Sequence, residues 1–245
     1  MTMGTLLLLG ARSDIGLATA HRFAKAGYDI QLAARNSAAL EPARADLQLR
    51  YNVSVSLHDF DVLDRQSYDR FLDALPELPD LVVCAIGLMG DQIENEKDIE
   101  AASLVVRSTY EGPALILEAL ANRFDRRGSG KIVGISSVAG NRGRAKNYVY
   151  GSAKAGFNAY LSGLRNRMAR RGIHVMTVLP GFVNTKMTHG MDLPEKLTAE
   201  PEEVADAIYE GLRRGRNVIY VRAIWRIVMT IINAIPEPIF KKMNI

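Results

Sequence analysis

Tyr150 and Lys154 are the residues of this 245-residue chain whose types and spacing most directly suggest catalysis. They lie four positions apart in a segment, residues 148–171, whose pattern predicts a helix, so both side chains would share one face. A lysine ammonium beside a phenol favours the phenolate and so lowers the pKa of the tyrosine. Tyr150 is therefore a candidate general acid that would protonate a carbonyl oxygen.

Ser136 and Ser137 give this pair a context, since a tyrosine and a lysine at such spacing are common in proteins. The two serines lie fourteen and thirteen residues before Tyr150, at the end of a predicted strand. In open parallel sheets, ligands bind at the carboxyl ends of the strands. We therefore expect the serines and the Tyr150–Lys154 pair at the same edge of a sheet.

A glycine-containing turn joins a predicted strand, Thr5–Leu9, to a predicted helix, residues 15–26. It reads Gly10-Ala11-Arg12-Ser13-Asp14-Ile15-Gly16. Glycines permit a tight turn and let phosphate oxygens approach backbone N–H groups at the start of the helix. We interpret the turn as a dinucleotide-binding element, although such turns also occur in other proteins. Asp14 either caps the helix or lies beside the pyrophosphate and repels it.

The second predicted strand, Asp29–Ala34, ends where dinucleotide-binding sheets contact the adenosine ribose. An acidic residue there accepts a hydrogen bond from a 2′-hydroxyl, whereas a basic residue accommodates a 2′-phosphate. This chain has Ala34 followed by Arg35, and Arg12 is available from the first turn. The pattern favours NADP(H) over NAD(H). The alternative is that Arg35 is an ordinary solvated arginine, which is the commoner state of a lone arginine.

Short apolar segments alternate with helical segments along the chain. The strands are predicted at residues 5–9, 29–34, 53–57, 81–86, 131–136, 173–179 and 218–221, and the helices at 15–26, 37–50, 65–75, 96–127, 148–171 and 201–214. This alternation predicts an α/β fold: a single Rossmann-type, doubly wound domain over residues 1–245. Helices would cover both faces of a parallel sheet of six to seven strands.

The composition argues against several classes of protein. Hydrophobic residues make up 48% and charged residues 24%, as in folded globular proteins. A net charge of +4 over 245 residues gives no reason to expect a nucleic-acid partner. The single cysteine, Cys84, excludes an intrachain disulfide, and no Cys/His spacing indicates a metal site. We expect a cytoplasmic protein, because no targeting segment is visible and one cysteine suits a reducing compartment.

Residues 220–245 form an apolar and basic tail. Aliphatic residues recur at helical spacing from Ile224 onward, and Trp225 lies at the start of this run. A tryptophan there, with Lys241 and Lys242 beside apolar residues, suits a peripheral contact with a membrane surface. Such a contact would place the protein at the inner face of the membrane. The alternatives are that the tail packs on the domain, contacts a neighbouring subunit, or forms a lid over the substrate.

Taken together, these motifs resemble the short-chain dehydrogenase/reductase family over essentially the whole chain. The resemblance rests on Gly10 and Gly16, Asp61-Val62, Gly87, Ile135-Ser136-Ser137, Tyr150-Gly151-Ser152-Ala153-Lys154 and Pro180-Gly181-Phe182-Val183-Asn184-Thr185. It implies an NAD(P)-dependent oxidoreductase that acts on CH–OH or carbonyl groups. It also implies a homodimer or a homotetramer.

The resemblance further implies a role for each motif residue. Tyr150 would be the acid/base, Lys154 would hold the nicotinamide ribose and tune Tyr150, and Ser137 would bind the substrate carbonyl. Asp61 and Val62 would lie beside the adenine. Further cofactor contacts would come from Gly10, Arg12, Ser13, Asp14, Ile15, Gly16, Arg35, Gly87, Pro180, Gly181, Val183 and Thr185.

Three positions depart from the family pattern. Asp14 replaces the middle glycine of the first turn, and Cys84-Ala85-Ile86-Gly87 lacks the family's asparagines. Thr109 stands where the family has a fourth catalytic residue, an asparagine that organises a water for proton relay. A threonine hydroxyl would replace this asparagine only in part, so we expect a slower relay rather than no catalysis.

Within the family, the segments 85–91, 147–156 and 225–245 resemble decaprenylphosphoryl 2-keto-ribose reductase. We expect an NADP-dependent carbonyl reductase with a small-molecule or lipid-linked carbonyl substrate under the loop 182–197. The alternatives are a soluble alcohol, sugar or steroid dehydrogenase of the same family, and a catalytically silent dinucleotide-binding sensor. The intact set of Ser137, Tyr150 and Lys154 argues against the sensor.

Overall fold

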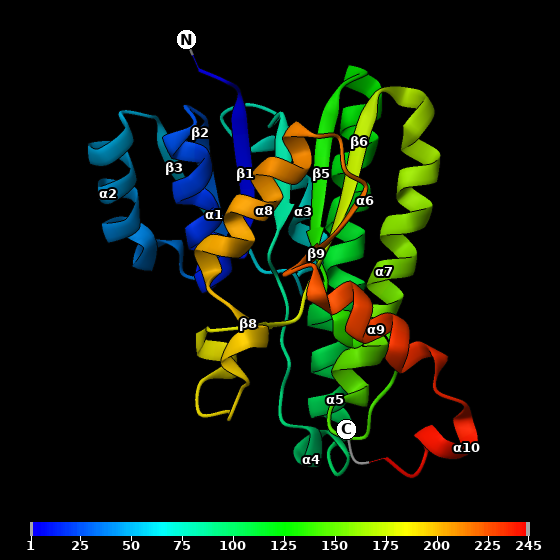
Figure 1. The fold of residues 1–245 in the computed structure, drawn as a ribbon. Coiled ribbons are helices and arrows are strands. Elements are labelled where there is room, and N and C mark those ends of the chain that lie inside the picture. Colours follow the sequence, from blue (N-terminus) through cyan, green and yellow to red (C-terminus); the bar gives the residue numbers. More distant parts are fainter. Residues whose placement is uncertain (1, 244–245) are drawn as a thin grey trace.

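The structure, a computed structural model, describes residues 2–243. Seven parallel strands form one sheet in the order β3-β2-β1-β4-β5-β6-β9. They are β1 (Thr5–Leu9), β2 (Asp29–Ala34), β3 (Val55–Asp59), β4 (Leu81–Cys84), β5 (Gly130–Ile135), β6 (Ile173–Pro180) and β9 (Val218–Val221). Helices lie on both faces of this sheet (Figure 1). The predicted doubly wound α/β fold is therefore confirmed.

Two hydrophobic cores lie on opposite faces of the sheet. Successive strand residues point to opposite faces, so Leu6 and Leu8 of β1 enter one core, and Leu7 and Leu9 enter the other. The first core packs against α1 (Asp14–Lys25), α2 (Glu41–Tyr51) and α8 (Pro201–Arg213). The second packs against α3 (Tyr68–Asp73), α6 (Gly112–Arg127) and α7 (Tyr148–Met168). Burial on both faces explains why the central strands read as continuous apolar runs.

The order of the strands reverses between β1 and β4. From β1 the chain adds β2 and β3 on one side, and from β4 it adds β5 and β6 on the other. At such a reversal, the loops that leave the two central strands diverge, and ligands bind in the crevice between them. The predicted motifs after β1, β4, β5 and β6 all leave this carboxyl edge of the sheet.

The helix predicted at 96–127 is interrupted. The segment contains α5 (Ile99–Val106), a π-helical turn over Arg107–Glu111, and α6. Pro113 has no N–H to donate to the carbonyl of Thr109, so one α-helical hydrogen bond is missing. The N–H of Gly112 donates to the carbonyl five residues earlier, which widens the turn. The predicted helix is thus present from Ile99 to Arg127, with one π-helical turn directly before Gly112 and Pro113.

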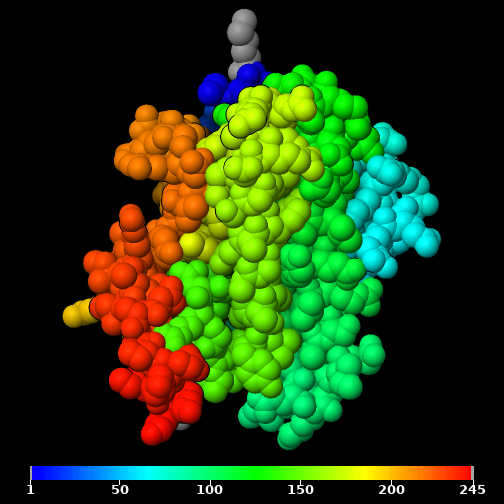
Figure 2. Space-filling model, turned by 90° about the vertical axis from the view of Figure 1, so that its right-hand side faces the viewer, coloured from blue at the N-terminus to red at the C-terminus, as the bar shows by residue number. Residues whose placement is uncertain are grey.

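Additional elements extend beyond the carboxyl edge. They are α4 (Gln92–Asn95), β7 (Phe182–Val183), β8 (Thr198–Ala199), α9 (Ile224–Ala234) and α10 (Glu237–Phe240). β7 pairs with β8, and residues 184–197 form the loop between them. Figure 2 shows α9 and α10, in red, on the surface beside the lower part of α7. Over residues 2–243, none of the helices has the length and apolar character needed to cross a membrane.

Candidate active site

A cavity of about 1060 Å³ opens at the carboxyl edge of the sheet. Of the residues predicted from the sequence, its walls include Arg12, Ser13, Asp14, Ile15, Gly87, Ser137, Tyr150, Lys154, Pro180, Gly181, Val183 and Thr185. The predicted residues Gly10, Gly16, Arg35, Asp61, Val62 and Thr109 do not line it. The fold thus brings the serine, the tyrosine and the lysine to one cavity, next to the turn after β1.

Tyr150 lies in the first turn of α7, with Ser137 beside its hydroxyl. Burial raises the pKa of Tyr150 to about 12, and a hydrogen bond with the Ser137 side chain opposes that rise. The Oγ of Ser137 also accepts the N–H of Ala139 at 3.1 Å, which fixes the serine side chain. A phenol with a raised pKa stays protonated at neutral pH. Tyr150 is therefore in the form that a general acid requires.

Lys154 is almost completely buried, with 3% of its surface exposed. Its Nζ donates to the carbonyl oxygen of Ile135 at 2.9 Å and lies 5.7 Å from the centre of the Tyr150 ring. Burial lowers the pKa of Lys154 to about 8. The net shift of the Tyr150 pKa is upward rather than downward as predicted, because burial of the phenol is the largest effect on it.

Thr109 is fully buried in the π-helical turn. Its hydroxyl donates to the carbonyl of Leu88 at 2.8 Å and accepts the N–H of Leu88 at 2.9 Å. Both bonds fix the loop after β4, where a Cβ on Gly87 would come within 3.3 Å of the Lys154 Nζ. Because the hydroxyl proton is used on the backbone, Thr109 has a positioning role. The predicted slower proton relay at this position stays a prediction.

The turn after β1 forms a cradle that requires glycine. Gly10 has a φ of +86°, and a Cβ there would lie 3.0 Å from the backbone of the loop after β4. A Cβ on Gly16 would lie 2.8 Å from the Gly10 carbonyl oxygen. Ser13 caps α1, because its Oγ accepts the N–H of Gly16 at 2.9 Å. The N-terminus of α1 therefore borders the cavity, as a phosphate-binding turn requires.

Asp14 contacts the loop that covers the cavity. Its Oδ2 accepts the N–H of Lys186 at 2.7 Å, and its Oδ1 lies 3.5 Å from the Nζ of the same lysine. Since Ser13 caps the helix, the interpretation of Asp14 as the cap is wrong. Asp14 instead connects the turn after β1 to the segment after β6, which sequence spacing gave no reason to expect.

Replacing Asp14 with alanine is expected to raise the KM of a carbonyl substrate roughly three- to tenfold, because one charge-assisted bond to the loop is lost. Asp14→Asn keeps an oxygen acceptor for the Lys186 N–H, so its KM is expected to lie between those of the unmodified protein and of Asp14→Ala. Steady-state kinetics measures the change, and limited proteolysis within residues 184–197 reports the order of the loop. An unchanged KM together with an unchanged cleavage rate would mean that this bond does not hold the loop.

Arg12 and Arg35 lie together beyond the end of β2. The Nη1 of Arg12 donates to the carbonyl of Arg35 at 3.3 Å, and both side chains are exposed. Ala34 is buried and brings no carboxylate to this position. Two cationic side chains are therefore available where the sequence predicted contact with a 2′-phosphate.

Asp61 and Val62 form a tight turn after β3. The Oδ1 of Asp61 accepts the N–H of Leu63 at 2.9 Å. Val62 packs against the start of α6, where a Cβ on Gly112 would lie 2.6 Å from the Val62 carbonyl oxygen. The predicted adenine-contacting turn is thus held in place by its own carboxylate and by α6.

Trp225 forms one wall of the cavity. Its indole exposes 3% of its surface, and Nε1 donates to the carbonyl of Leu197 at 3.0 Å. The ring also packs edge-on against Phe182, with 5.2 Å between centroids. Gly181 makes this approach possible, since a Cβ there would lie 1.9 Å from the indole. Interpreting Trp225 as a membrane-interface residue was therefore wrong, because the indole points into the protein.

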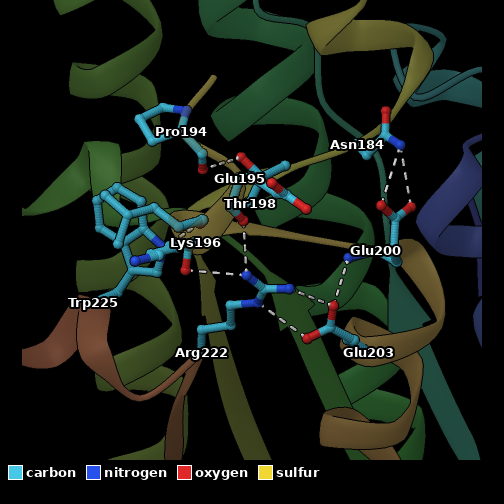
Figure 3. Close-up of polar contacts among 10 residues, drawn as sticks. Asn184, Pro194, Glu195, Lys196, Thr198, Glu200, Glu203, Arg222 and Trp225 are labelled. Carbon is cyan, nitrogen blue, oxygen red and sulfur yellow. Dashed lines mark hydrogen bonds and ion pairs between the residues drawn. The ribbon is translucent and has the colours of Figure 1, made fainter. Parts of the chain in front are cut away.

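Arg222 links the covering loop to α8 (Figure 3). Its Nη1 donates to the carbonyls of Glu195 and Lys196, each at 3.0 Å, while Nε and Nη2 bind the two carboxylate oxygens of Glu203 at 3.1 and 2.9 Å. Its φ of 51° is unusual for a residue with a side chain. Arg222 and the neighbouring Trp225 together hold the loop over the cavity.

Arg142 holds the tail from the other side. Its guanidinium donates to the carbonyls of Ile232 and Ile235 and to the carboxylate of Glu237. It also stacks over the ring of Phe240 at 3.5 Å. The C-terminal carbonyls of α9 are thus paired with a cation, which also favours the helix dipole.

Sequence reasoning assigned no role to several residues that line the cavity, among them Arg144 and Gln92, and it did not foresee that Trp225 does so. Phe182 and Lys186 lie within the loop 182–197 that the sequence placed over the substrate, and Lys186 directly follows the Pro180–Thr185 motif. Arg144 precedes Tyr150 by six residues. No residue pattern marked Arg144 or the inward direction of Trp225, because both depend on contacts between distant segments.

Comparison with known proteins identifies the family. The short chain dehydrogenase family pattern matches residues 5–196. An uncharacterized oxidoreductase of Streptomyces coelicolor is 36% identical over 242 residues, which cover 98% of this chain and 95% of the relative. One from Mycobacterium tuberculosis H37Rv is 34% identical over 241 residues, with 97% and 96% covered.

A solved structure is also similar. A short-chain dehydrogenase from Sphingobium yanoikuyae in complex with NADPH matches with a TM-score of 0.82 and 27% identity, covering 96% of this chain and 97% of that one. The chain therefore belongs to the short-chain dehydrogenase/reductase family and is an oxidoreductase acting on alcohol or carbonyl groups. These relatives do not support the narrower resemblance to decaprenylphosphoryl 2-keto-ribose reductase.

Proposed function

We propose that the protein is an NADP(H)-dependent carbonyl reductase. The observation that carries this proposal is the meeting of Ser137, Tyr150 and Lys154 in one cavity beside the glycine cradle after β1. The cradle fits a dinucleotide, because Gly10 and Gly16 permit the close backbone packing that brings the start of α1 to the cavity, where phosphates would bind. When bound, the nicotinamide cofactor supplies the hydride that reduces the carbonyl carbon.

Three side chains of the cavity have distinct roles in the proposed reaction. Tyr150 donates its hydroxyl proton to the carbonyl oxygen, and the hydroxyl of Ser137 donates a hydrogen bond to the same oxygen. Lys154 keeps a positive charge near the phenol, which favours the phenolate formed by proton donation. It also holds the ribose of the cofactor. In the direction of alcohol oxidation, Tyr150 accepts the proton instead.

The proposed preference for NADP(H) rests on Arg12 and Arg35. The Arg12 guanidinium is bonded to the backbone carbonyl of Arg35, whose side chain is also exposed, and a 2′-phosphate would bring up to two negative charges to this pair of arginines. The NADPH complex of the 27%-identical Sphingobium enzyme is consistent with this preference.

Arg35→Ala is expected to weaken NADPH binding roughly ten- to a hundredfold, because it removes one charge-assisted hydrogen bond to the 2′-phosphate. Binding of NADH should change little. Dissociation constants measured by titration at low and high salt test this, since screening should weaken the effect at high salt. Arg126→Ala, an exposed change at the end of α6, is the matched control. Equal NADPH and NADH affinities in the unmodified protein at low salt would contradict the preference.

The substrate proposed here is a small-molecule or lipid-linked carbonyl compound. Met187, Met191 and Leu193 of the covering loop give the cavity an adaptable apolar wall. A lipid-linked substrate draws its support from the exposed apolar side chains of α9. Soluble alcohol, sugar or steroid substrates of the same reaction class remain the alternative, since the loop side chains select by shape and apolar character alone.

A cofactor-oxidation assay against a panel of ketones and aldehydes tests the function. Consumption of NADPH that depends on the carbonyl and on Tyr150 is expected. A dinucleotide-binding sensor, in contrast, would bind NADPH without any turnover across the panel. Such a result would exclude the reductase function and support the sensor function.

We also propose that the outer face of α9 makes a peripheral contact with the inner face of the membrane. Ile224, Ile227 and Ile231 expose 45, 59 and 61% of their surfaces, and Lys241 and Lys242 follow α10. Exposed apolar side chains beside cations suit an anionic lipid surface. The alternative is that this face contacts a neighbouring subunit.

Flotation with anionic vesicles distinguishes a membrane contact from a subunit contact on this face of α9. Ile227→Ser with Ile231→Ser is expected to abolish co-flotation with vesicles that contain phosphatidylglycerol, while the cavity wall formed by Trp225 is left in place. The oligomeric state of the same variant is measured by light scattering. A variant that dissociates into monomers, with no flotation of the unmodified protein, would assign the face to a subunit contact.

A further inference from the structure

Arg144 is a cavity residue that the proposed chemistry does not use. It lies between β5 and α7, in the wall that also contains Gln92 of α4. The side-chain oxygen of Gln92 accepts the N–H of Val149 at 3.2 Å, which joins α4 to the start of α7. Figure 1 shows α4 well away from the turn after β1. The Arg144 carbonyl accepts the N–H of Asn147 at 3.0 Å, so Arg144 directly precedes α7, the helix that Gln92 joins to α4.

Among the residues that the structure describes, no carboxylate forms an ion pair with the guanidinium of Arg144. Its Nε is buried and has no hydrogen-bond partner among residues 2–243. Burial lowers the pKa of Arg144, and no neighbouring carboxylate acts against this effect. Arginine nevertheless stays charged in proteins. A partly buried cation without an anion is unfavourable, so an anionic ligand would gain more here than at a solvated arginine.

Four other charged residues that line the cavity, Asp14, Lys154, Asp91 and Glu96, have partners of their own. Asp14 bonds with Lys186, and Lys154 donates to the Ile135 carbonyl. Asp91 accepts the N–H of Glu94 at 2.9 Å and so caps α4. Glu96 accepts from Gln92 at 3.2 Å. The charge of Arg144 is thus left for a ligand rather than for the fold.

We propose that Arg144 binds an anionic group of the substrate, a carboxylate or a phosphate, at the end remote from the carbonyl. This rests on the proposed function, because it assumes that a carbonyl compound occupies the cavity. The planar guanidinium presents donors in a fork that matches both kinds of anion. Met89, Ile93 and Met191 line the same cavity. The substrate is therefore an amphiphilic carbonyl compound, apolar in part and anionic at one end.

Trp225 makes a direct binding assay possible. It is the single tryptophan of the chain and it lines the cavity, so its fluorescence reports on occupancy without any turnover. The probes are two matched pairs: 5-oxohexanoate with its methyl ester, and dihydroxyacetone phosphate with dihydroxyacetone. Each is titrated into the protein saturated with NADP⁺. The two pairs distinguish a carboxylate from a phosphate as the preferred anion.

The anionic member of at least one pair is expected to bind about tenfold more tightly than its neutral partner. Arg144→Gln should remove that difference, and Arg144→Lys should restore part of it. Arg126→Gln, a solvent-exposed control, should leave the difference unchanged. Binding of NADP⁺ to each variant is measured in parallel and should not depend on Arg144.

Two results would overturn the proposal. One is equal affinity of both members in each pair, or a preference that survives Arg144→Gln. The other is a weakening of NADP⁺ binding by Arg144→Gln, which would assign Arg144 to the cofactor. A tenfold anion preference that depends on Arg144, with no NADPH oxidation by any carbonyl, would uphold the anion site and refute the reductase.

Discussion

Tyr150→Phe is expected to lower kcat by about a hundredfold to ten-thousandfold, the usual contribution of a positioned general acid. The phenyl ring is retained, so packing at the start of α7 should change little. Only the hydroxyl that lies beside Ser137 is removed, and with it the proton for the carbonyl oxygen. Cofactor oxidation with the best ketone of the panel measures the loss, and circular dichroism checks the fold.

Tyr160→Phe provides a matched control on the same helix. Its hydroxyl donates to Glu118 at 3.1 Å and does not border the cavity. Removing that hydroxyl should therefore leave turnover nearly intact. If Tyr150→Phe kept more than about a tenth of the activity, a proton donor other than Tyr150 would be required.

Lys154→Met is expected to lower kcat/KM at least a hundredfold and to weaken cofactor binding. Its ammonium is the buried cation nearest the phenol, 5.7 Å from the ring centre, so the phenolate formed during turnover would lose its stabilising charge. Titration of NADPH and steady-state kinetics measure the two effects separately. A rate loss with unchanged NADPH affinity would restrict Lys154 to tuning Tyr150.

The pH profile provides an independent check on Lys154. Burial lowers its pKa to about 8, so the ammonium is mostly charged at pH 7 and is lost as the pH rises through 8. The kcat/KM of the unmodified protein should therefore fall on the alkaline side of about pH 8. Lys154→Met should lack this limb, whereas Lys25→Met, at the exposed end of α1, should keep it. An alkaline limb that survives in Lys154→Met would have to come from another group.

The fold was predictable because local patterns and burial agree. Strands such as Leu81–Cys84 are buried on both faces, so they read as unbroken apolar runs. Each run is followed by a helical pattern, and the right-handed crossover rule leaves few topologies. The catalytic set was predictable for the same reason. Tyr150 and Lys154 share a helix, and Ser137 follows the strand that packs beside it.

The side-chain contacts of Asp14 and Thr109 were not predictable in this way. Asp14 bonds with Lys186, a residue 172 positions away, and no local pattern encodes such a distance. Thr109 occupies the family's asparagine position, but a π-helical turn directs its hydroxyl to Leu88. The pKa of Tyr150 is raised rather than lowered because burial of the phenol, which no local pattern shows, is the largest effect on it.

The contact between Gly181 and Trp225 constrains the order in which this protein can change by mutation. A side chain at position 181 would occupy the space of the indole, which lies 1.9 Å from the ideal Cβ position. Any path to a larger residue at 181 must therefore first replace Trp225 with a smaller one. That first step leaves a cavity where the indole packed, and it frees the Leu197 carbonyl from its donor. Natural variants should accordingly change position 225 before position 181, passing through an intermediate with a looser loop and broader substrate acceptance.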